Sequence, residues 1–406
     1  MRSGLVGSDP IGAWIRETHH SPVRSPAQTV SSFDRRARRM SELGTASPSS
    51  TGIIIGVDTH KFVHVAVAID HLGTRLASCS ASADRAGYAE LVVWARTLGH
   101  IEAFGIEGTG SYGVGLASYC RRQALRVVEV SHCDRRKRRN NGKSDTLDAE
   151  SAARSVLAGL STAVPKSADG AAEMVRQIKV ARDTAVKARS AAIIALKTLL
   201  VNAPCELRES LQPLTDRKLI DRCARLLPGV LDDTTASTKH ALRALAARWL
   251  ALASEIETHD EGLDAITMAA APTLRQAFGI GADSVAEMMI VAGDNPTRVR
   301  SESAFAKLCG VCPIPASSGV THRHRLFRGG HRQANAALYR IVTVRMRWHQ
   351  PTIDYVARRT AQGLSKRDII RCLKRFVARE IYHGLLIDHR ARNAVTARCL
   401  NSILDT

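Results

Sequence analysis

Four acidic residues of this chain occupy positions from which their carboxylates could act together. Asp58 follows the apolar run "GIIIGV", Glu107 follows "EAFGI", and Asp145 and Asp148 begin the segment "DTLDAESAARSVLAG". If that segment is a helix, the two aspartates project from one face about one turn apart. Two anions so close either repel each other in water or hold a cation between them. Hard divalent cations prefer oxygen ligands, so these acids are candidate ligands of Mg²⁺ or Mn²⁺.

The segments around these acids predict a sheet flanked by helices. β-branched runs at 52–58, 61–70 and 74–82 predict three antiparallel strands in a meander. Apolar spacing then predicts helix, strand, helix, strand and helix, over 84–98, 102–108, 112–123, 125–131 and 145–159. This order is expected of a ribonuclease H-like α/β domain, in which the strands ending at Asp58 and Glu107 lie side by side. The start of the last helix would pack across them.

A structural explanation of the same acids competes with the metal site. Aspartate and glutamate are common at strand ends as turn and cap residues, and Ser144 with Asp145 is a good N-cap for the helix that follows. From spacing alone both interpretations stay open. The glycines in "GIEGTGSYG" favour the functional one, because they allow a backbone to approach closely after Glu107.

Two basic segments are candidate contacts for nucleic acid. The loop "SSGVTHRHRLFRGGHRQ" contains Ser317 and Ser318 with several arginines, whose guanidinium groups bind phosphate bidentately. The run "HCDRRKRRNNGK" concentrates positive charge in the same way. A solvated basic face is the alternative for both segments. The candidate nucleic-acid-binding residues are Arg135, Arg136, Lys137, Arg138, Arg139, Lys143, Arg323, Arg325, Arg328 and Arg332.

The composition points to a polyanionic partner. The 406 residues include 58 Lys and Arg against 38 Asp and Glu, a formal charge of +20, which favours nucleic acid. No apolar run is long enough to span a bilayer, so we expect no membrane association. Nine cysteines without a secretory signal indicate reduced thiols in a reducing compartment, and we expect a cytoplasmic protein. Cys309 and Cys312 superficially resemble half of a zinc site with His322 and His324, but we interpret them as ordinary thiols.

The pattern along the chain predicts several parts. Residues 1–50 read as a disordered basic leader, 51–165 as the α/β domain, and 166–268 as a helical coiled-coil arm with breaks at Pro204 and at 226–230. Residues 269–390 form a mostly α-helical C-terminal domain, and 391–406 a tail. Within that domain, "FGIGADSVAEMMI" resembles a helix-hairpin-helix whose backbone amides could meet a phosphate, although an ordinary helix turn is the alternative.

Motifs in both halves resemble one family. "GVDTHK", "GIEGTGSYG" and "KSDTLDAESAA" are similar to the DEDD domain of the insertion sequence 110 transposases, whose nuclease domain resembles the junction resolvase RuvC. The segments "FGIGADSVAEMMIVAGD" and "SAFAKLCGVCPIPASSGVTHRHRLFRGGHRQANAALY" resemble the C-terminal transposase domain of that family. The resemblance implies that Asp58, Glu107, Asp145 and Asp148 hold Mg²⁺ (or Mn²⁺). It also implies a catalytic serine before a glycine, which matches Ser318, with Ser317 as the adjacent alternative.

The resemblance implies a transposase or recombinase that acts in the bacterial cytoplasm, in association with the nucleoid. Ser318 would attack a DNA phosphate and form a covalent phosphoserine link, and the two domains would share one composite site. A structured noncoding RNA would pair with donor and target DNA, and the chain would act as a homo-oligomer, dimer or tetramer, assembled through its helical arm. Two alternatives are a metal-only nuclease similar to a Holliday-junction resolvase and a catalytically inactive nucleic-acid-binding protein.

Overall fold

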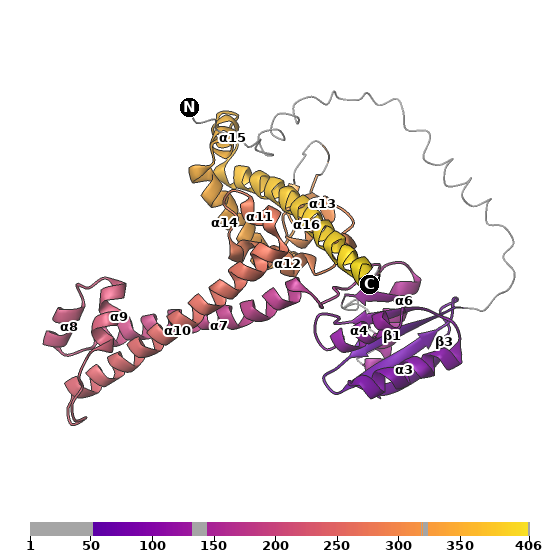
Figure 1. The fold of residues 1–406 in the computed structure, drawn as a ribbon, viewed down its shortest axis with the longest axis horizontal. Coiled ribbons are helices and arrows are strands. Elements are labelled where there is room, and N and C mark those ends of the chain that lie inside the picture. Colours follow the sequence, from indigo (N-terminus) through magenta and orange to yellow (C-terminus); the bar gives the residue numbers. More distant parts are fainter. Residues whose placement is uncertain (1–51, 132–143, 318, 320–323, 405–406) are drawn as a thin grey trace. The chain divides into compact units, whose positions relative to one another are not determined.

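The computed structural model describes residues 52–131, 144–317, 319 and 324–404 (Figure 1). The chain divides into two compact units, with the division between Ser167 and Ala168. The first unit is a mixed α/β structure and the second is mostly helical, which confirms the fold class predicted for each region at this level. The domain boundaries given above remain predictions.

The first unit follows the predicted order of strands and helices. Its elements are β1 (Ile53–Thr59), β2 (Val63–Ile69), β3 (Arg75–Ser82), α3 (Arg85–Leu98), β4 (Ile101–Glu107), α4 (Val114–Arg122), β5 (Val127–Val130) and α6 (Asp145–Leu157). The five strands form one sheet in the order β3-β2-β1-β4-β5. The first three strands are antiparallel, as the meander predicts, and β4 runs parallel to both β1 and β5. This arrangement is consistent with a RuvC-like domain.

Helices cover both faces of the central part of this sheet, which explains why β1 and β4 are apolar and almost wholly buried, whereas the edge strand β3 is mostly exposed. Ile53, Ile55 and Val57 of β1 pack against α3 and α4, whereas Ile54 packs against α6. Successive side chains of a strand point to opposite faces, so this alternation buries both sides of β1. Among the described residues of this unit, α3 and α4 pack on one face of the sheet and α6 packs on the other, which gives three layers (Figure 1).

The second unit is built mainly from helices. Its elements are α7 (Ala171–Val201), α8 (Cys205–Leu211), α9 (Asp216–Ala224), α10 (Thr234–Ala270), α11 (Pro272–Gln276), α12 (Ala282–Ala292), η1 (Pro296–Arg298), α13 (Glu302–Leu308), β6 (Pro313–Pro315), β7 (His324–Leu326), α14 (Arg332–Trp348), α15 (Gln350–Ala361) and α16 (Lys366–Leu404). Helix α16 continues past residue 390, where the sequence analysis ends the C-terminal domain.

Helices α7 and α10 pack along each other in the second unit (Figure 1). The chain leaves α7 just before Pro204, and 226–230 form the connection to α10, so both predicted breaks are confirmed. Apolar residues such as Leu196 of α7, Ile220 of α9 and Leu242 of α10 form a core at one end of the pair. A coiled-coil arm remains a proposal.

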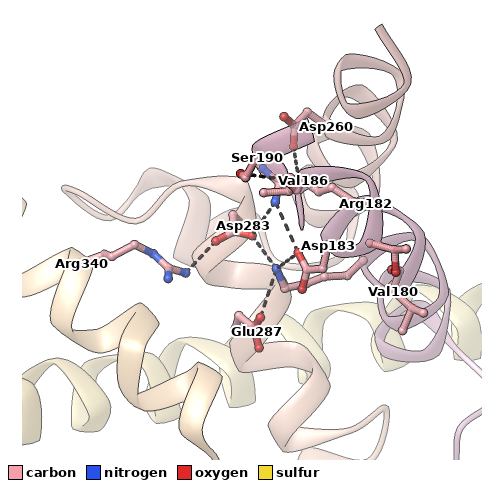
Figure 2. A network of polar contacts seen from close by, with 11 residues as sticks. Val180, Arg182, Asp183, Val186, Ser190, Asp260, Asp283, Glu287 and Arg340 are labelled. Atoms are coloured by element: carbon pink, nitrogen blue, oxygen red, sulfur yellow. Dashed lines mark hydrogen bonds and ion pairs between the residues drawn. The ribbon is translucent and has the colours of Figure 1, made fainter. Parts of the chain in front are cut away.

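A buried group of charges joins the other end of this helix pair to α12 and α14 (Figure 2). Lys179 of α7 is only 6 % exposed, and its Nζ lies 2.6 Å from Asp283 Oδ1 and 3.1 Å from Glu287 Oε1. Arg340 of α14 donates to the other oxygen of Asp283 at 2.7 Å. An unpaired charge at such a depth would be costly, so these contacts fix the helices relative to one another.

A second buried ion pair holds α14 against α16. The guanidinium of Arg345 donates two hydrogen bonds to Glu380, at 2.7 and 2.9 Å, and a third from Nε to the carbonyl oxygen of Phe278 at 2.8 Å. Since Phe278 lies in the turn between α11 and α12, the side chain of Arg345 connects that turn to α14 and α16.

None of the helices in the described part of the chain combines the length and apolar character that crossing a bilayer requires.

Candidate active site

The acids at the strand ends lie on neighbouring strands. In the parallel pair of β1 and β4, Val57 is the register partner of Ile106, so the next residues, Asp58 and Glu107, follow at the same edge of the sheet. Gly56 and Gly105 are also register partners, and both lie on the face that α6 covers. Because side chains alternate along a strand, Asp58 and Glu107 belong to that same face.

The two paired glycines explain how α6 comes close enough to bring its acids to this edge. A Cβ atom on Gly56 would lie 2.0 Å from the carbonyl oxygen of Ala149, and one on Gly105 would lie 2.7 Å from a methyl group of Val156. The backbone of α6 therefore packs directly against β1, at a distance that only glycine permits. This packing sets the height of the first turn of α6 above the strand ends.

The first turn of α6 carries the other two acids. Ser144 is the N-cap, as predicted, and its hydroxyl accepts a hydrogen bond from the backbone N–H of Leu147 at 3.3 Å. Asp145 and Asp148 both lie in the first turn, where the positive end of the helix dipole favours carboxylates. Asp148 is buried, whereas the side chain of Asp145 is half-exposed. The two carboxylates therefore lie at different depths, one inside the unit and one at its surface.

The electrostatics of Asp58 indicate that the other three acids lie near enough to act on its charge. Burial raises the pKa of Asp58, nearby His60 lowers it, and the negative charges of Glu107, Asp148 and Asp145 raise it further, with a net upward shift. Each of the three other acids therefore acts on Asp58 by like-charge repulsion. The structure brings together all four acidic residues that the sequence analysis singled out.

A tight turn holds Glu107 in place. Gly108 has a φ of +67°, a left-handed conformation that favours glycine, and its carbonyl oxygen accepts from the N–H of Ser111 at 2.8 Å. The hydroxyl of Thr59 donates to the carbonyl oxygen of Glu107 at 2.9 Å, which ties the end of β4 to the end of β1. A Cβ atom on Gly110 would meet nothing within 4 Å, so the outer part of this turn is open.

His60 joins this group, although the sequence analysis did not single it out. Its Nε2 lies 3.2 Å from Asp58 Oδ2 and 3.4 Å from Asp145 Oδ2. The side chains of His, Cys, Asp and Glu commonly bind metals. Among the described residues, one group of at least three of them has ligand atoms all within 4.8 Å of one another, and it consists of Asp58, His60 and Asp145. The available signal was the spacing of Asp58 and His60, which places both on one side of an extended chain.

The donor set fits a divalent cation. Carboxylate oxygens are the ligands that Mg²⁺ and Mn²⁺ prefer, and four acids in one partly buried cluster repel one another until a cation compensates them. Burial is the main cause of the raised pKa of Asp58, and repulsion by the other three acids adds to it. The cluster can therefore hold a cation at the edge of the sheet.

The serine loop of the second unit connects two short strands. β6 and β7 are antiparallel, with Pro313 paired to Leu326 and Pro315 to His324, and the connection between them contains both candidate serines. Ser317 is exposed, whereas Ser318 lies outside the described residues. Arg323 and the basic residues Arg135, Arg136, Lys137, Arg138, Arg139 and Lys143 also lie outside them.

The remaining arginines of this region are available to a partner. Arg325, Arg328 and Arg332 are exposed, and within the part of the chain that the structure describes none of them has an acidic partner within 4 Å. Their placement is compatible with phosphate binding. That role remains a prediction.

The base of the serine loop is fixed by contacts that the sequence did not reveal. A Cβ atom on Gly330 would lie 2.2 Å from the backbone nitrogen of Gly310, so the chain entering the loop and the chain leaving it touch here. The side-chain amide of Asn335 donates to the carbonyl oxygens of Cys309 and Gly310, at 3.1 and 2.9 Å, and its oxygen accepts from Lys374. Two chain segments are thus held together below the loop.

Two further sequence motifs have defined surroundings. In the proposed helix-hairpin-helix, α11 and α12 flank a turn that contains Gly279 with a φ of +72°, but the first-turn carboxylate of α12, Asp283, already pairs with Lys179 and Arg340. A phosphate contact there remains a prediction.

Cys309, which the sequence analysis compares with a zinc ligand, is fully buried. Burial raises the pKa of its thiol to about 12, which disfavours the thiolate that zinc requires.

Comparison with known families agrees with both halves of the structure. A family model for the DEDD domain of IS110 elements, described as a transposase, matches residues 55–203, which include all four acids. A second model, described as the transposase IS116/IS110/IS902 family, matches residues 271–357, which include the serine loop. No curated protein is similar enough to this chain to count as a match.

The two matched regions occur in the order of one transposase and together cover more than half of the 406 residues. The clustered acids of the first unit lie inside the first match, as expected of a DEDD domain. The chain therefore belongs to the IS110 family of transposases, enzymes that cut and rejoin DNA.

Proposed function

We propose that this transposase cuts and rejoins DNA with Ser318 as nucleophile and with a divalent cation held by Asp58, Glu107, Asp145 and Asp148. The observation that supports this most is the convergence of the four carboxylates at the end of β1, where three of them act on the pKa of Asp58. Four acids close together at a solvent-facing sheet edge have little structural benefit, because like charges repel one another and destabilise the fold.

The metal would be Mg²⁺ or Mn²⁺. When bound, it would neutralise charge that develops on phosphate oxygens during strand cleavage. The chain's own residues have separate tasks. Asp148 and Glu107 supply buried carboxylates whose positions are fixed by α6 and by the turn at Gly108, whereas Asp145 supplies one at the solvent side.

The second unit would supply the nucleophile. We propose that the hydroxyl of Ser318 attacks the phosphorus atom of the scissile phosphodiester, that a phosphoserine bond forms, and that the bond to one sugar oxygen breaks. Arg325, Arg328 and Arg332 would bind the flanking phosphates. Asn335 would keep the two ends of the loop together while the DNA strand is exchanged.

The test of this mechanism is a covalent adduct. Wild-type protein is incubated with substrate DNA, the flanking noncoding RNA of its element and Mg²⁺, then denatured and examined for protein that carries DNA. We expect the adduct in wild type and in the matched control Ser317→Ala, and its loss in Ser318→Ala. Cleavage that depends on Asp148 without any adduct would instead indicate the metal-only nuclease, and loss in Ser317→Ala alone would move the nucleophile to Ser317.

We also propose a noncoding RNA partner that pairs with donor and target DNA. The formal charge of +20 is large enough to hold two polyanions at once. RNA that copurifies with the chain should map to the flanks of its element, and a random RNA of equal length should compete poorly. Equal competition would reduce the role of RNA to charge neutralisation.

We also propose that the chain forms a homo-oligomer, either a dimer or a tetramer. Val180, Ile194 and Val201 of α7 are more than half exposed, so this helix presents large apolar side chains to solvent in a single copy of the chain. A contact between copies through α7 and α10 would cover them. Light scattering should find a mass above 44.0 kDa for wild type and a lower one for Ile194→Lys.

A further inference from the structure

His60 lies where a ligand of the proposed metal would lie. β1 ends at Thr59, and the imidazole of the next residue faces both Asp58 and Asp145, which come from positions far apart in the sequence. Its Nε2 lies 3.2 Å from an oxygen of Asp58 and 3.4 Å from an oxygen of Asp145. One nitrogen and two oxygens from two elements thus form a compact set of donor atoms at the solvent side of the cluster.

The spacing of these atoms suits a shared cation. Two neighbouring ligands of an octahedral ion with bonds of about 2.1 Å lie about 3.0 Å apart. The two distances from the imidazole exceed that value by only a few tenths of an ångström, and all the donor atoms of the group lie within 4.8 Å of one another. Small side-chain adjustments would therefore convert an imidazole–carboxylate contact into joint ligation.

A nitrogen ligand changes which cation the site prefers. Mg²⁺ takes oxygen ligands and water almost exclusively, whereas first-row transition ions also accept imidazole. A cluster of carboxylates alone would discriminate little between Mg²⁺ and Mn²⁺. The same cluster with an imidazole in reach favours Mn²⁺.

We infer that His60 is a metal ligand that acts with Asp58 and Asp145 and gives this site a preference for Mn²⁺ over Mg²⁺. The inference rests on the proposed function, since it concerns the cation held by the four acids. A histidine that only paired with the carboxylates as a counter-ion would have the opposite effect, because it would compete with any cation for the same oxygens.

Metal binding to the purified full-length chain, without nucleic acid, separates these cases. Mn²⁺ binding is followed by the EPR signal of the free ion, and Mg²⁺ by its displacement of Mn²⁺, at about pH 8, where an ordinary histidine is neutral. We expect His60→Ala to weaken Mn²⁺ binding about tenfold or more and Mg²⁺ binding by less than about threefold. The control His71→Ala, an exposed histidine in the turn after β2, should leave both unchanged.

A spectroscopic measurement on wild type avoids reliance on the variant's fold. Pulsed EPR of bound Mn²⁺ should show coupling to the ¹⁴N nucleus of an imidazole, and this coupling should be absent in His60→Ala. Absence of ¹⁴N coupling in wild type, or equal or tighter Mn²⁺ binding by His60→Ala, would overturn the inference.

The variant Asp58→Asn distinguishes failure of this inference from failure of the proposed site. If Asp58→Asn loses both cations while His60→Ala binds both as wild type does, the acidic site stands and His60 is no ligand. If wild type binds neither cation in a manner that depends on Asp58, the proposed metal site fails, and the role of His60 fails with it.

Discussion

At the residue scale, the candidate active site is a set of charges that the fold holds together against their mutual repulsion. Asp148 and Glu107 are buried at 6 % and 8 % exposure, and both act on Asp58, whose pKa is raised first by burial and then by its acidic neighbours. Such an arrangement reduces stability in the absence of a cation. Residues kept at that cost are candidates for function rather than for folding.

Replacing Asp148 by Asn tests this trade between stability and activity. We expect strand cleavage to fall at least about 100-fold because a ligand is removed. The thermal midpoint without metal should change little, because the repulsion that is removed offsets the favourable interaction of Asp148 with the start of α6. Cleavage assays and thermal melts measure the two effects. Glu150→Gln, on the same helix but paired with Arg154, is the control and should retain activity. A large drop in stability for Asp148→Asn would contradict the interpretation.

The four acids could be located from the sequence because each follows a recognisable element boundary. Asp58 and Glu107 end apolar strands, and Asp145 follows the N-cap Ser144, so topology alone brought them to one edge. His60 and Asn335 could not be found in this way. Their importance depends on contacts with Asp145 and with Gly310, which are distant in sequence. The one local signal, the position of His60 two residues after Asp58, is too common in extended segments to identify a site residue by itself.

At the element scale, the position of α6 depends on two glycines. Gly56→Ala would place a methyl group 2.0 Å from the carbonyl oxygen of Ala149 and force α6 away from β1. We expect a loss of about 1–3 kcal/mol in the free energy of unfolding, with a loss of cleavage because Asp145 and Asp148 move with the helix. Chemical denaturation and cleavage assays measure these effects. Gly110→Ala, whose Cβ would meet nothing within 4 Å, should change neither.

The charge group around Lys179 should contribute strongly to the stability of the second unit. Lys179→Met leaves Asp283 and Glu287 with one cationic partner fewer in a buried setting, so we expect a loss of about 3 kcal/mol. Urea unfolding followed by circular dichroism measures this loss. On the same helix, Arg176→Met removes an ion pair to Glu173 whose arginine side chain is 49 % exposed, and should cost less than about 1 kcal/mol. Similar losses for both variants would refute the distinction.

Asp283 should make the second unit sensitive to acid. Burial by itself would raise the pKa of this carboxyl, but Lys179, Arg340 and Arg182 outweigh that effect and hold it below its ordinary value of 3.8. A carboxyl with a lowered pKa stabilises the folded state above its ordinary pKa, and this stabilisation is lost as the pH falls through the lowered value. The free energy of unfolding should therefore decline as the pH falls from about 5 to about 3.

The variant Asp283→Asn tests this assignment. It should be less stable than wild type near neutral pH, because its partners lose a counter-charge, and its decline in acid should be shallower. Urea titrations at a series of pH values give both quantities. An unchanged acid decline would assign the effect to other carboxyl groups, such as Glu302, whose pKa is also lowered, by Arg379 and Arg375 against the opposing effect of burial.

The elements that could be predicted are those with long apolar periodicity. The helical region predicted to break at Pro204 contains α7, which runs from Ala171 to Val201 and ends just before that proline. The cap at its other end was not predictable, since the carboxylate of Asp294 accepts from the N–H of Ala172 at 2.6 Å across a long stretch of sequence. β6 and β7 were also missed, because strands of three residues have no periodicity and prolines at both ends of β6 argue against a strand.

At the scale of the whole molecule, the excess of positive charge determines how the protein meets nucleic acid. A net charge of +20 is a property of composition, so a polyanionic partner could be predicted before any fold was known. The serine nucleophile could be proposed only from family resemblance, because no sequence spacing distinguishes a nucleophilic serine from any other serine in an arginine-rich loop. The division between Ser167 and Ala168 separates the acidic cluster from the serine loop, so the composite site remains a proposal.

The salt dependence of DNA binding tests which charges take part. Binding to duplex DNA should weaken steeply with salt, and the triple variant of Arg325, Arg328 and Arg332 to Ala should reduce the logarithmic slope by about 0.9 for each phosphate that the variant no longer binds. Fluorescence anisotropy over a range of salt concentrations gives the slope. A triple variant that removes the exposed residues Arg217, Arg243 and Arg248 of α9 and α10 is the matched control. Equal slopes for the two variants would mean that the serine loop has no special share in binding.

The hairpin of β6 and β7 makes the segment 316–323 an exchangeable cassette. Pro315 and His324, the residues that flank the segment, are register partners in the hairpin. Contacts among Gly310, Gly330 and Asn335 hold the two chain segments together next to the hairpin. Both ends of the segment are therefore fixed close to each other. A replacement of similar length need not disturb the helices underneath. The segment is therefore a suitable place to install a thiol in place of the serine hydroxyl, or the equivalent segment of a relative, to alter the chemistry without redesigning the scaffold.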